Sequence, residues 1–169
     1  MTVTYRDASP KDAANLDRVF DTSFCDTFAH LYRTEDLETF LSKFGLDEWE
    51  TQLGDPECAF RIAEVDGEPV GYVKIGPQKL PVETSRPALL LDQLYVLKEH
   101  HGAGIAHDLM DWALSEGKRR GAEEIYLTVF TENHRARRFY DRYGFEAVGR
   151  YDFMVGNHAD EDVIMKKIL

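Results

Sequence analysis

The sequence predicts an α/β fold in which helices cover both faces of a mixed β-sheet. Strand-like stretches, alternating or continuously apolar, are separated by stretches whose apolar residues recur at helical spacing. Glycines follow several of the helical stretches, where helices commonly end. A length of 169 residues with 43% hydrophobic residues suits one core. We therefore predict a single domain over residues 1–169 with the element order β-ααα-ββ-β-α-β-α-β-β.

The N-terminal third predicts one short strand and three helices. Residues 3–5 alternate as a strand. Ser9–Asp12 supplies a helix N-cap, a proline at the first helical position and an acid, and apolar residues then follow one helical face up to Phe28. Two further helical patterns span residues 37–44 and 46–53. Three aromatic residues near the end of the first helix are expected in the core or beside a pocket: Phe24, Phe28 and Tyr32.

The middle of the chain predicts a hairpin and then a central strand. Residues 60–64 and 70–75 read as strands, and the Asp66-Gly67 pair between them is typical of a tight turn. A loop over residues 76–87 follows. The apolar run Leu89–Val96 is too continuous for a surface strand, so we predict that it is buried.

A glycine loop, His101-Gly102-Ala103-Gly104, follows the central strand, and helical spacing resumes at Ile105. The first N–H groups of a helix lack intrahelical partners, and the helix dipole places partial positive charge there. Because glycine lets the backbone approach a ligand closely, the loop predicts a phosphate or pyrophosphate site. An ordinary strand-to-helix turn is the alternative.

The C-terminal part predicts a strand, a helix and two last strands. The helix after the glycine loop ends near Gly121, residues 124–130 alternate, residues 133–143 are helical, and residues 145–151 and 163–169 complete the sheet. The glycine loop then lies at the carboxyl end of the central strand, where open α/β sheets bind ligands.

The net charge of -11 narrows the classes of partner. Most of the excess acid lies in residues 1–92. Such a chain is a poor candidate for nucleic-acid binding, which needs a basic surface, and a better one for a cationic small molecule. Acidity that serves only solubility is the alternative.

We expect a soluble cytoplasmic protein without metal or membrane partners. No apolar run reaches the length of a transmembrane helix, and the beginning MTVTYRDASP lacks the regions of a signal peptide. Cys25 and Cys58 are far apart and are expected to be free thiols. The histidines do not form a ligand set, so no metal is predicted: His100, His101, His107 and His134.

Two common phosphate-binding motifs do not fit the glycine loop. A Walker A loop needs Lys and then Ser or Thr where this sequence has Ile105-Ala106. The Rossmann fingerprint needs a third glycine within an N-terminal βαβ unit, whereas this loop lies in mid-chain.

A second segment, taken with the loop, resembles a known family. Residues 133–145 read Asn-His-Arg-Ala-Arg-Arg-Phe-Tyr-Asp-Arg-Tyr-Gly-Phe. Together the two segments resemble the GCN5-related N-acetyltransferases (GNAT), and the likeness runs the length of the chain. The family's Gln/Arg-x-x-Gly-x-Gly/Ala motif falls on residues 101–106, with His101 in the place of glutamine or arginine. The resemblance implies the GNAT fold, with a mostly antiparallel sheet, and one N-acetyltransferase domain.

Within this family the chain resembles the Pai-type spermidine/spermine N-acetyltransferases, in DQLYVLKEHHGAGIA and in the ending GRYDFMVGNHADEDVIMKKIL. The resemblance implies direct acetyl transfer from acetyl-CoA to a primary amine such as spermidine or spermine. A peptide N-terminus, an amino acid or an aminoglycoside are alternative acceptors, and a non-catalytic acyl-CoA sensor is an alternative class. The family includes monomers and dimers, so a homodimer is possible.

The resemblance assigns a catalytic role to Tyr140, and Asp92 on the central strand is the candidate base. Acetyl transfer needs a neutral amine, a stabilised oxyanion and a proton for the departing thiolate. A phenol with a pKa of about 10 can protonate a thiolate whose conjugate acid has a pKa of about 8.5. The alternatives are a tyrosine that only packs in the core and an aspartate that only orients its strand.

The resemblance also implies which residues hold the cosubstrate. Asn133 would cap its helix and bond the pantetheine arm, and the backbone of Leu94–Leu97 would pair with that arm as an added strand. Candidates for the 3′-phosphate are Arg137, Arg138 and Arg142. The complete set is Leu94, Tyr95, Val96, Leu97, His101, Gly102, Ala103, Gly104, Ile105, Ala106, Asn133, Ala136, Phe139 and Tyr140.

Overall fold

The computed structural model describes residues 2–169 and contains one seven-stranded sheet in the order β1-β2-β3-β4-β5-β7-β6. All neighbouring pairs are antiparallel except β4 and β5, which are parallel. The strands are β1 (Val3–Asp7), β2 (Ala59–Val65), β3 (Glu68–Pro77), β4 (Ala88–Val96), β5 (Glu124–Phe130), β6 (Glu146–Val155) and β7 (His158–Ile168). The predicted mixed, mostly antiparallel sheet is confirmed.

The helices occur in the predicted order. The α-helices are α1 (Ala13–Phe28), α2 (Thr34–Leu41), α3 (Leu46–Leu53), α4 (Ile105–Arg119) and α5 (His134–Arg142), and the short 3-10 helices are η1 (Pro10–Asp12), η2 (Ala29–Leu31) and η3 (Lys98–His100). Within residues 2–169, none has the length and apolar composition that a membrane crossing requires.

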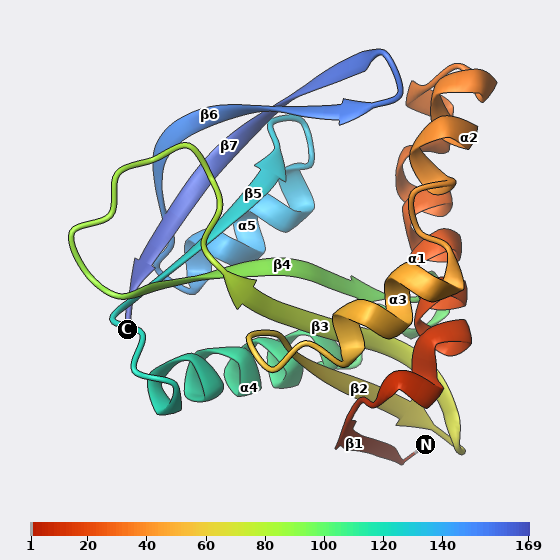
Figure 1. Ribbon diagram of the computed structural model, residues 1–169, viewed down its shortest axis with the longest axis horizontal. Helices are drawn as coiled ribbons and strands as arrows, with labels where there is room; N and C mark the ends of the chain where they lie inside the picture. Colours follow the sequence, from red (N-terminus) through yellow and green to blue (C-terminus); the bar gives the residue numbers. More distant parts are fainter. Residues whose placement is uncertain (1) are drawn as a thin grey trace.

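Helices cover the two faces of the sheet in separate groups (Figure 1). On one face α4 buries Leu109 and Met110, and Tyr140 of α5 joins the same apolar cluster. On the other face α1 and α3 bury Phe20 and Trp49. Each helix carries an apolar stripe at helical spacing, and removing that stripe from water is what holds it against the sheet.

Most predicted boundaries agree closely with the structure, and the largest difference is in the last two strands. β6 and β7 continue to a hairpin tip at Gly156-Asn157, whereas the predicted strands ended at Tyr151 and resumed at Val163. The polar residues of this stretch hid its strand character, because some of their carboxylates face a cavity inside the protein.

Strand β4 is only partly the buried strand that its apolar run predicts. Leu90 and Leu91 are buried, but the rest of the strand is half-buried. The reason is that β4 pairs with β5 only over Ala88–Leu90, after which the two strands diverge (Figure 1). The sheet is therefore split along its second half.

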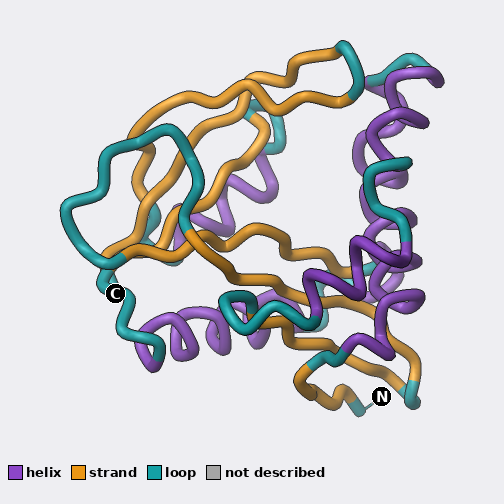
Figure 2. Tube along the Cα trace, in the orientation of Figure 1, coloured by secondary structure: helices purple, strands orange, loops and turns teal. Residues whose placement is uncertain are grey.

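The β6–β7 hairpin tip reaches across to α2, as the Cα trace in Figure 2 shows. The backbone N–H of Asn157 donates a hydrogen bond of 2.9 Å to Oδ1 of Asp36. The rings of Phe40 and Phe153 pack edge to face with centroids 5.6 Å apart. The C-terminal β6–β7 hairpin thus contacts the N-terminal helix α2.

Candidate active site

Two adjoining cavities open where β4 and β5 diverge. The loop cavity, of about 490 Å³, lies beside the glycine loop and the first turns of α4 and α5. The carboxylate cavity, of about 210 Å³, lies among β4, β5, β7 and the end of α1. Seven residues border both cavities and join them: Thr27, Leu94, Val96, His101, Asn133, Ala136 and Tyr140.

The glycine loop forms a cradle at the start of α4. Gly102 and Gly104 both have a φ of +82°, a conformation that favours glycine. At either position an added Cβ would have no neighbouring atom within 4 Å, so the space beside the loop is open. The first N–H groups of α4, which have no intrahelical partner, follow this loop directly, and together with the helix dipole they suit a pyrophosphate.

Strand β4 presents a free edge next to this cradle. Its pairing with β5 ends at Leu90, and in residues 2–169 no other strand pairs with that edge. A chain that carries amides can add to such an edge as an extra strand. The arrangement fits the pantetheine arm.

His101 ties the end of β4 to the start of α5. Its Nδ1 contacts the guanidinium of Arg135, and its Nε2 lies 2.7 Å from the carbonyl oxygen of Val96. A guanidinium has only donors, so Nδ1 accepts and Nε2 carries the ring proton that is donated to Val96. The residue that departs from the family motif is thus bonded through both ring nitrogens.

Helix α5 supplies two of the predicted site residues. Oδ1 of Asn133 accepts a hydrogen bond of 3.3 Å from the N–H of Ala136, which confirms the predicted N-cap. Tyr140 packs on Phe139 and Phe145 and also borders both cavities. Burial raises the pKa of Tyr140 to about 12, so its phenol keeps its proton at neutral pH. Tyr140 therefore both packs in the core and borders the site.

Asp92 lines the carboxylate cavity at an irregularity in β4. Lys74 pairs with Gln93 and Ile75 pairs with Leu91, so Asp92 is the extra residue of a β-bulge. Its Oδ2 accepts a hydrogen bond of 2.7 Å from the buried ammonium of Lys74. Its role as a base remains a prediction, and the structure adds that it neutralises a buried lysine.

Two carboxylates that the sequence reasoning missed lie on β7, at Asp160 and Asp162, which are 5% and 6% exposed. Asp160 accepts hydrogen bonds from the hydroxyl of Tyr32 and from Nε2 of His158. Burial and the charge of Asp160 raise the pKa of Asp162 to about 7, against the opposing hydrogen bond from Thr128.

A sequence signal for these two residues did exist. They are two positions apart, directly before the apolar run that begins at Val163, so they share one face of the strand. Glu161 between them faces the other way and pairs with Arg150.

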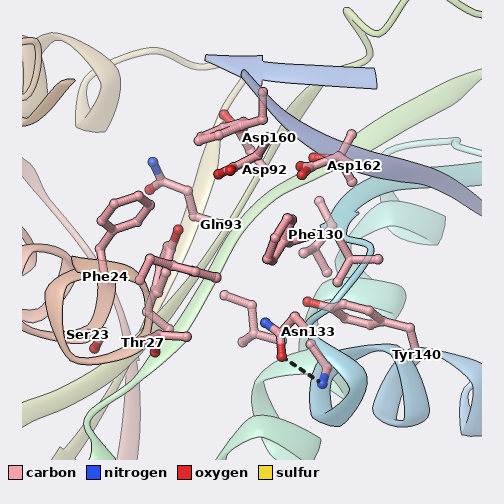
Figure 3. A pocket seen from close by; sticks show the side chains of 18 of the residues that line it. Ser23, Phe24, Thr27, Asp92, Gln93, Phe130, Asn133, Tyr140, Asp160 and Asp162 are labelled. Carbon is pink, nitrogen blue, oxygen red and sulfur yellow. Dashed lines mark hydrogen bonds between the residues drawn. The ribbon is translucent and has the colours of Figure 1, made fainter. Parts of the chain in front are cut away.

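Aromatic side chains form the remaining walls of the carboxylate cavity. Phe24, Phe28 and Tyr32 border it and also belong to the apolar cluster under α1, so both places considered for them, the core and a pocket, are found. Figure 3 shows the three aspartates on the opposite side of Phe130 from Asn133 and Tyr140. The hydroxyl of Ser23, on α1, is buried at this cavity without a hydrogen-bond partner in residues 2–169.

The structure brings most of the predicted cosubstrate set together. Those lining the loop cavity are Leu94, Val96, His101, Gly102, Gly104, Ile105, Ala106, Asn133, Ala136, Phe139 and Tyr140. Tyr95 lines the carboxylate cavity instead. Leu97 and Ala103 line neither cavity.

Of the three arginines predicted for the 3′-phosphate, only Arg142 borders the loop cavity. Arg135, which was not in the predicted set, borders it as well. Arg137 instead donates a hydrogen bond to the carbonyl of Thr131, and Arg138 lines neither cavity. Over residues 2–169 there is no group of three or more His, Cys, Asp or Glu side chains arranged to hold a metal ion.

Comparisons with known proteins agree with this geometry. Residues 22–145 match the profile of the Acetyltransferase (GNAT) family. An uncharacterized N-acetyltransferase of Lactobacillus delbrueckii subsp. lactis is 27% identical over 95% of this chain and 94% of its own length. N-alpha-acetyltransferase 40 of Saccharomyces cerevisiae is 37% identical, over 37% of this chain and 25% of its own length.

A solved structure shares the whole fold. The PaiA N-acetyltransferase of Thermoplasma acidophilum, in complex with coenzyme A, superposes with a TM-score of 0.80 at 22% identity and full coverage of both chains. It is a Pai-type protein, in agreement with the resemblance seen in the sequence, and at this identity it shows the fold. With the family profile, the glycine cradle and the split sheet in agreement, the chain belongs to the GNAT family of N-acetyltransferases, enzymes whose acetyl donor is acetyl-CoA.

Proposed function

We propose that this N-acetyltransferase acts on a primary amine of a small polycation, such as spermidine or spermine. The observation that carries the proposal is that Asp92, Asp160 and Asp162 line one cavity with aromatic walls, directly beside the loop cavity. Carboxylates attract ammonium groups, and aromatic rings pack against methylene chains and attract cations through their faces.

The loop cavity supports the placement of acetyl-CoA. The glycine cradle and the start of α4 suit the pyrophosphate, and the free edge of β4 suits the pantetheine arm. Arg135 and Arg142 border this cavity and are proposed for the 3′-phosphate. The acetyl group would then lie near the residues shared by the two cavities, with Tyr140 among them.

Tyr140 is proposed as the acid of the reaction. The amine nitrogen attacks the acetyl carbonyl, the C–N bond forms, and the C–S bond breaks. The thiolate takes the proton of the Tyr140 phenol, and the phenolate regains one from the nitrogen, which must lose it to become an amide. The raised pKa of Tyr140 means that the phenol carries its proton at neutral pH and that the phenolate, once formed, readily takes the proton of the nitrogen.

A peptide N-terminus is the second candidate acceptor. It is favoured by the partial match to an N-alpha-acetyltransferase. Both acceptors carry a primary amine, but a polyamine always carries further ammonium groups for the remaining carboxylates, whereas a peptide carries them only where it has basic side chains.

An amine panel tests the proposal. Release of CoA thiol would be measured with spermidine, spermine, monoacetylated spermidine, an aminoglycoside, a free amino acid and a short peptide with a free N-terminus. We expect the highest kcat/KM for the polyamines. Turnover of the peptide with spermidine no better than buffer would overturn the polyamine assignment, and CoA binding without turnover of any amine would favour a sensor.

Two further expectations are proposals of the same kind: that residues 1–169 form one N-acetyltransferase domain and that the protein is cytoplasmic. For the oligomeric state, a monomer and a homodimer are both kept as alternatives. Light scattering during size-exclusion chromatography would measure the molar mass of the protein and so distinguish a monomer from a homodimer.

A further inference from the structure

We propose that Asp162 is the group that takes the proton from the acceptor ammonium, a role for which the sequence pointed to Asp92. The inference rests on the proposed function, because it concerns an amine that arrives protonated. An amine with a pKa near 10 is almost entirely an ammonium at neutral pH, and the ammonium nitrogen has no lone pair for attack. One of the groups around the acceptor must therefore remove a proton.

The other two carboxylates of the cavity are already engaged. Asp92 accepts the hydrogen bond of the buried Lys74 ammonium, and the ammonium of Lys79 lies 3.7 Å from the same oxygen. Asp160 uses one oxygen for the hydroxyl of Tyr32 and the other for the ring of His158, at 3.1 Å. Both oxygens of Asp160 are thus engaged, and Asp92, whose Oδ1 is free within residues 2–169, has its negative charge compensated by a buried lysine.

Asp162 forms no ion pair with any of residues 2–169, and the side chain of Thr128 is the group that lowers its pKa. On β5 it pairs across from Phe130, and on β6 from Tyr151. The titratable and charged groups that face it are Asp160 on the same strand, Asp92 and Tyr95 of β4, Tyr32 after η2, and His158 bound to Asp160. The nearest charged neighbour, Asp160, is negative.

These surroundings make Asp162 a carboxylate that can change its protonation state near neutral pH. Burial and the charge of Asp160 raise its pKa to about 7, while burial keeps Tyr32 and Tyr95 protonated by raising their pKa values. A carboxylate whose pKa is raised holds a proton more tightly than an ordinary aspartate does, so Asp162 is the better proton acceptor.

The step balances without another reagent. One proton of the R–NH3⁺ group moves to the Asp162 carboxylate, which leaves the neutral amine R–NH2 and a carboxylic acid. The amine then attacks the acetyl carbonyl as described for Tyr140. The carboxylic acid returns its proton to solvent before the next ammonium enters.

The proposal is tested by the pH dependence of kcat/KM for the best amine, which reports ionisations of the free enzyme and free amine. For the unmodified enzyme we expect kcat/KM to rise with pH, with the midpoint of the rise near pH 7. This rising part of the pH profile is called the limb. Asp162→Asn should lose this limb and lower kcat by about 100-fold, a typical contribution of a general base. Asp92→Asn should keep the limb, moved only toward lower pH, because Lys74 loses the counter-charge that Asp92 supplies beside the same cavity.

A second variant keeps the test decisive if Asp162→Asn folds poorly, which melting and CoA titration would reveal. Asp160→Asn removes the negative neighbour and should move the limb to lower pH, because Asp162 then ionises more easily. The proposal would be overturned if the limb did not move in Asp160→Asn. It would also be overturned if the limb were lost in Asp92→Asn and kept in Asp162→Asn. A raised KM with the limb intact in Asp162→Asn would show ammonium binding alone and would overturn it too.

Failure of this inference is distinct from failure of the proposed function. If no amine of the panel is acetylated, the function is wrong. If polyamines are acetylated well and the limb does not follow Asp162 and Asp160, only the assignment of Asp162 is wrong.

Discussion

The loop cavity and the carboxylate cavity differ in which parts of the chain supply their residues. Apart from Thr27 of α1, the residues of the first come from two short stretches, residues 94–107 and residues 133–142, which supply a strand edge, two glycines and a helix start. The second is formed by side chains that come from α1, β4, β5 and β7. A site made of short stretches is specified by local sequence, whereas a site made of side chains from distant segments depends on how the whole sheet is assembled.

The largest expected effect comes from the residue that the two cavities share. Tyr140→Phe removes the phenol proton and keeps the ring in the core, so we expect kcat to fall by about 100- to 1,000-fold. CoA affinity, measured by calorimetry, and the melting temperature should change little. Unchanged turnover would show that Tyr140 only packs in the core.

A change confined to the loop cavity should affect the cosubstrate alone. Gly104→Ala places a side chain at a φ of +82°, so we expect the cradle to distort and CoA to bind about tenfold more weakly. Gly121→Ala is the matched control, because Gly121 has a φ of +88°, equally open space and a place at the other end of α4. Equal loss of CoA affinity in both variants would contradict the cradle.

A change at the hairpin tip should weaken binding of the acceptor and leave binding of acetyl-CoA unchanged. A Cβ at Gly156 would lie 2.5 Å from Cα of Asp36, so Gly156→Ala must push the tip away from α2. We expect the free energy of unfolding to fall by about 1–3 kcal/mol and the acceptor KM to rise, with the KM for acetyl-CoA unchanged. Gly67→Ala is the control, since Gly67 has a φ of +80° and no atom within 4 Å of its Cβ position. An acceptor KM that rises as much in Gly67→Ala would deny the tip a special role.

The smallest expected effect is that of salt. The carboxylate cavity attracts a polycation, and charges are screened over about 10 Å at 0.1 M salt, so the acceptor KM should rise by about twofold between low and physiological ionic strength. The KM for acetyl-CoA should change less, because salt screens both its repulsion by a chain of net charge -11 and its attraction to Arg135 and Arg142. Steady-state assays at several salt concentrations would separate the two, and a salt-independent acceptor KM would argue against electrostatic attraction.

The sequence by itself determined the element order, the glycine loop, the N-cap at Asn133 and the family. These depend on local rules: periodicity, the conformational freedom of glycine and the hydrogen-bonding needs of a helix start. It also pointed to Tyr140, which borders both cavities, because the segment that carries this residue is contiguous; its catalytic role stays a prediction.

Only the tertiary structure showed the extent of the last hairpin and the character of the carboxylate cavity. Asp160 and Asp162 read as ordinary surface residues until β7 is inserted between β5 and β6 and turns them inward. Asp92 likewise stands out as an acid in the sequence, but its buried lysine partner comes from β3. The properties of a carboxyl group depend on the charges and the water around it, and for these residues both come from parts of the chain that are distant in sequence.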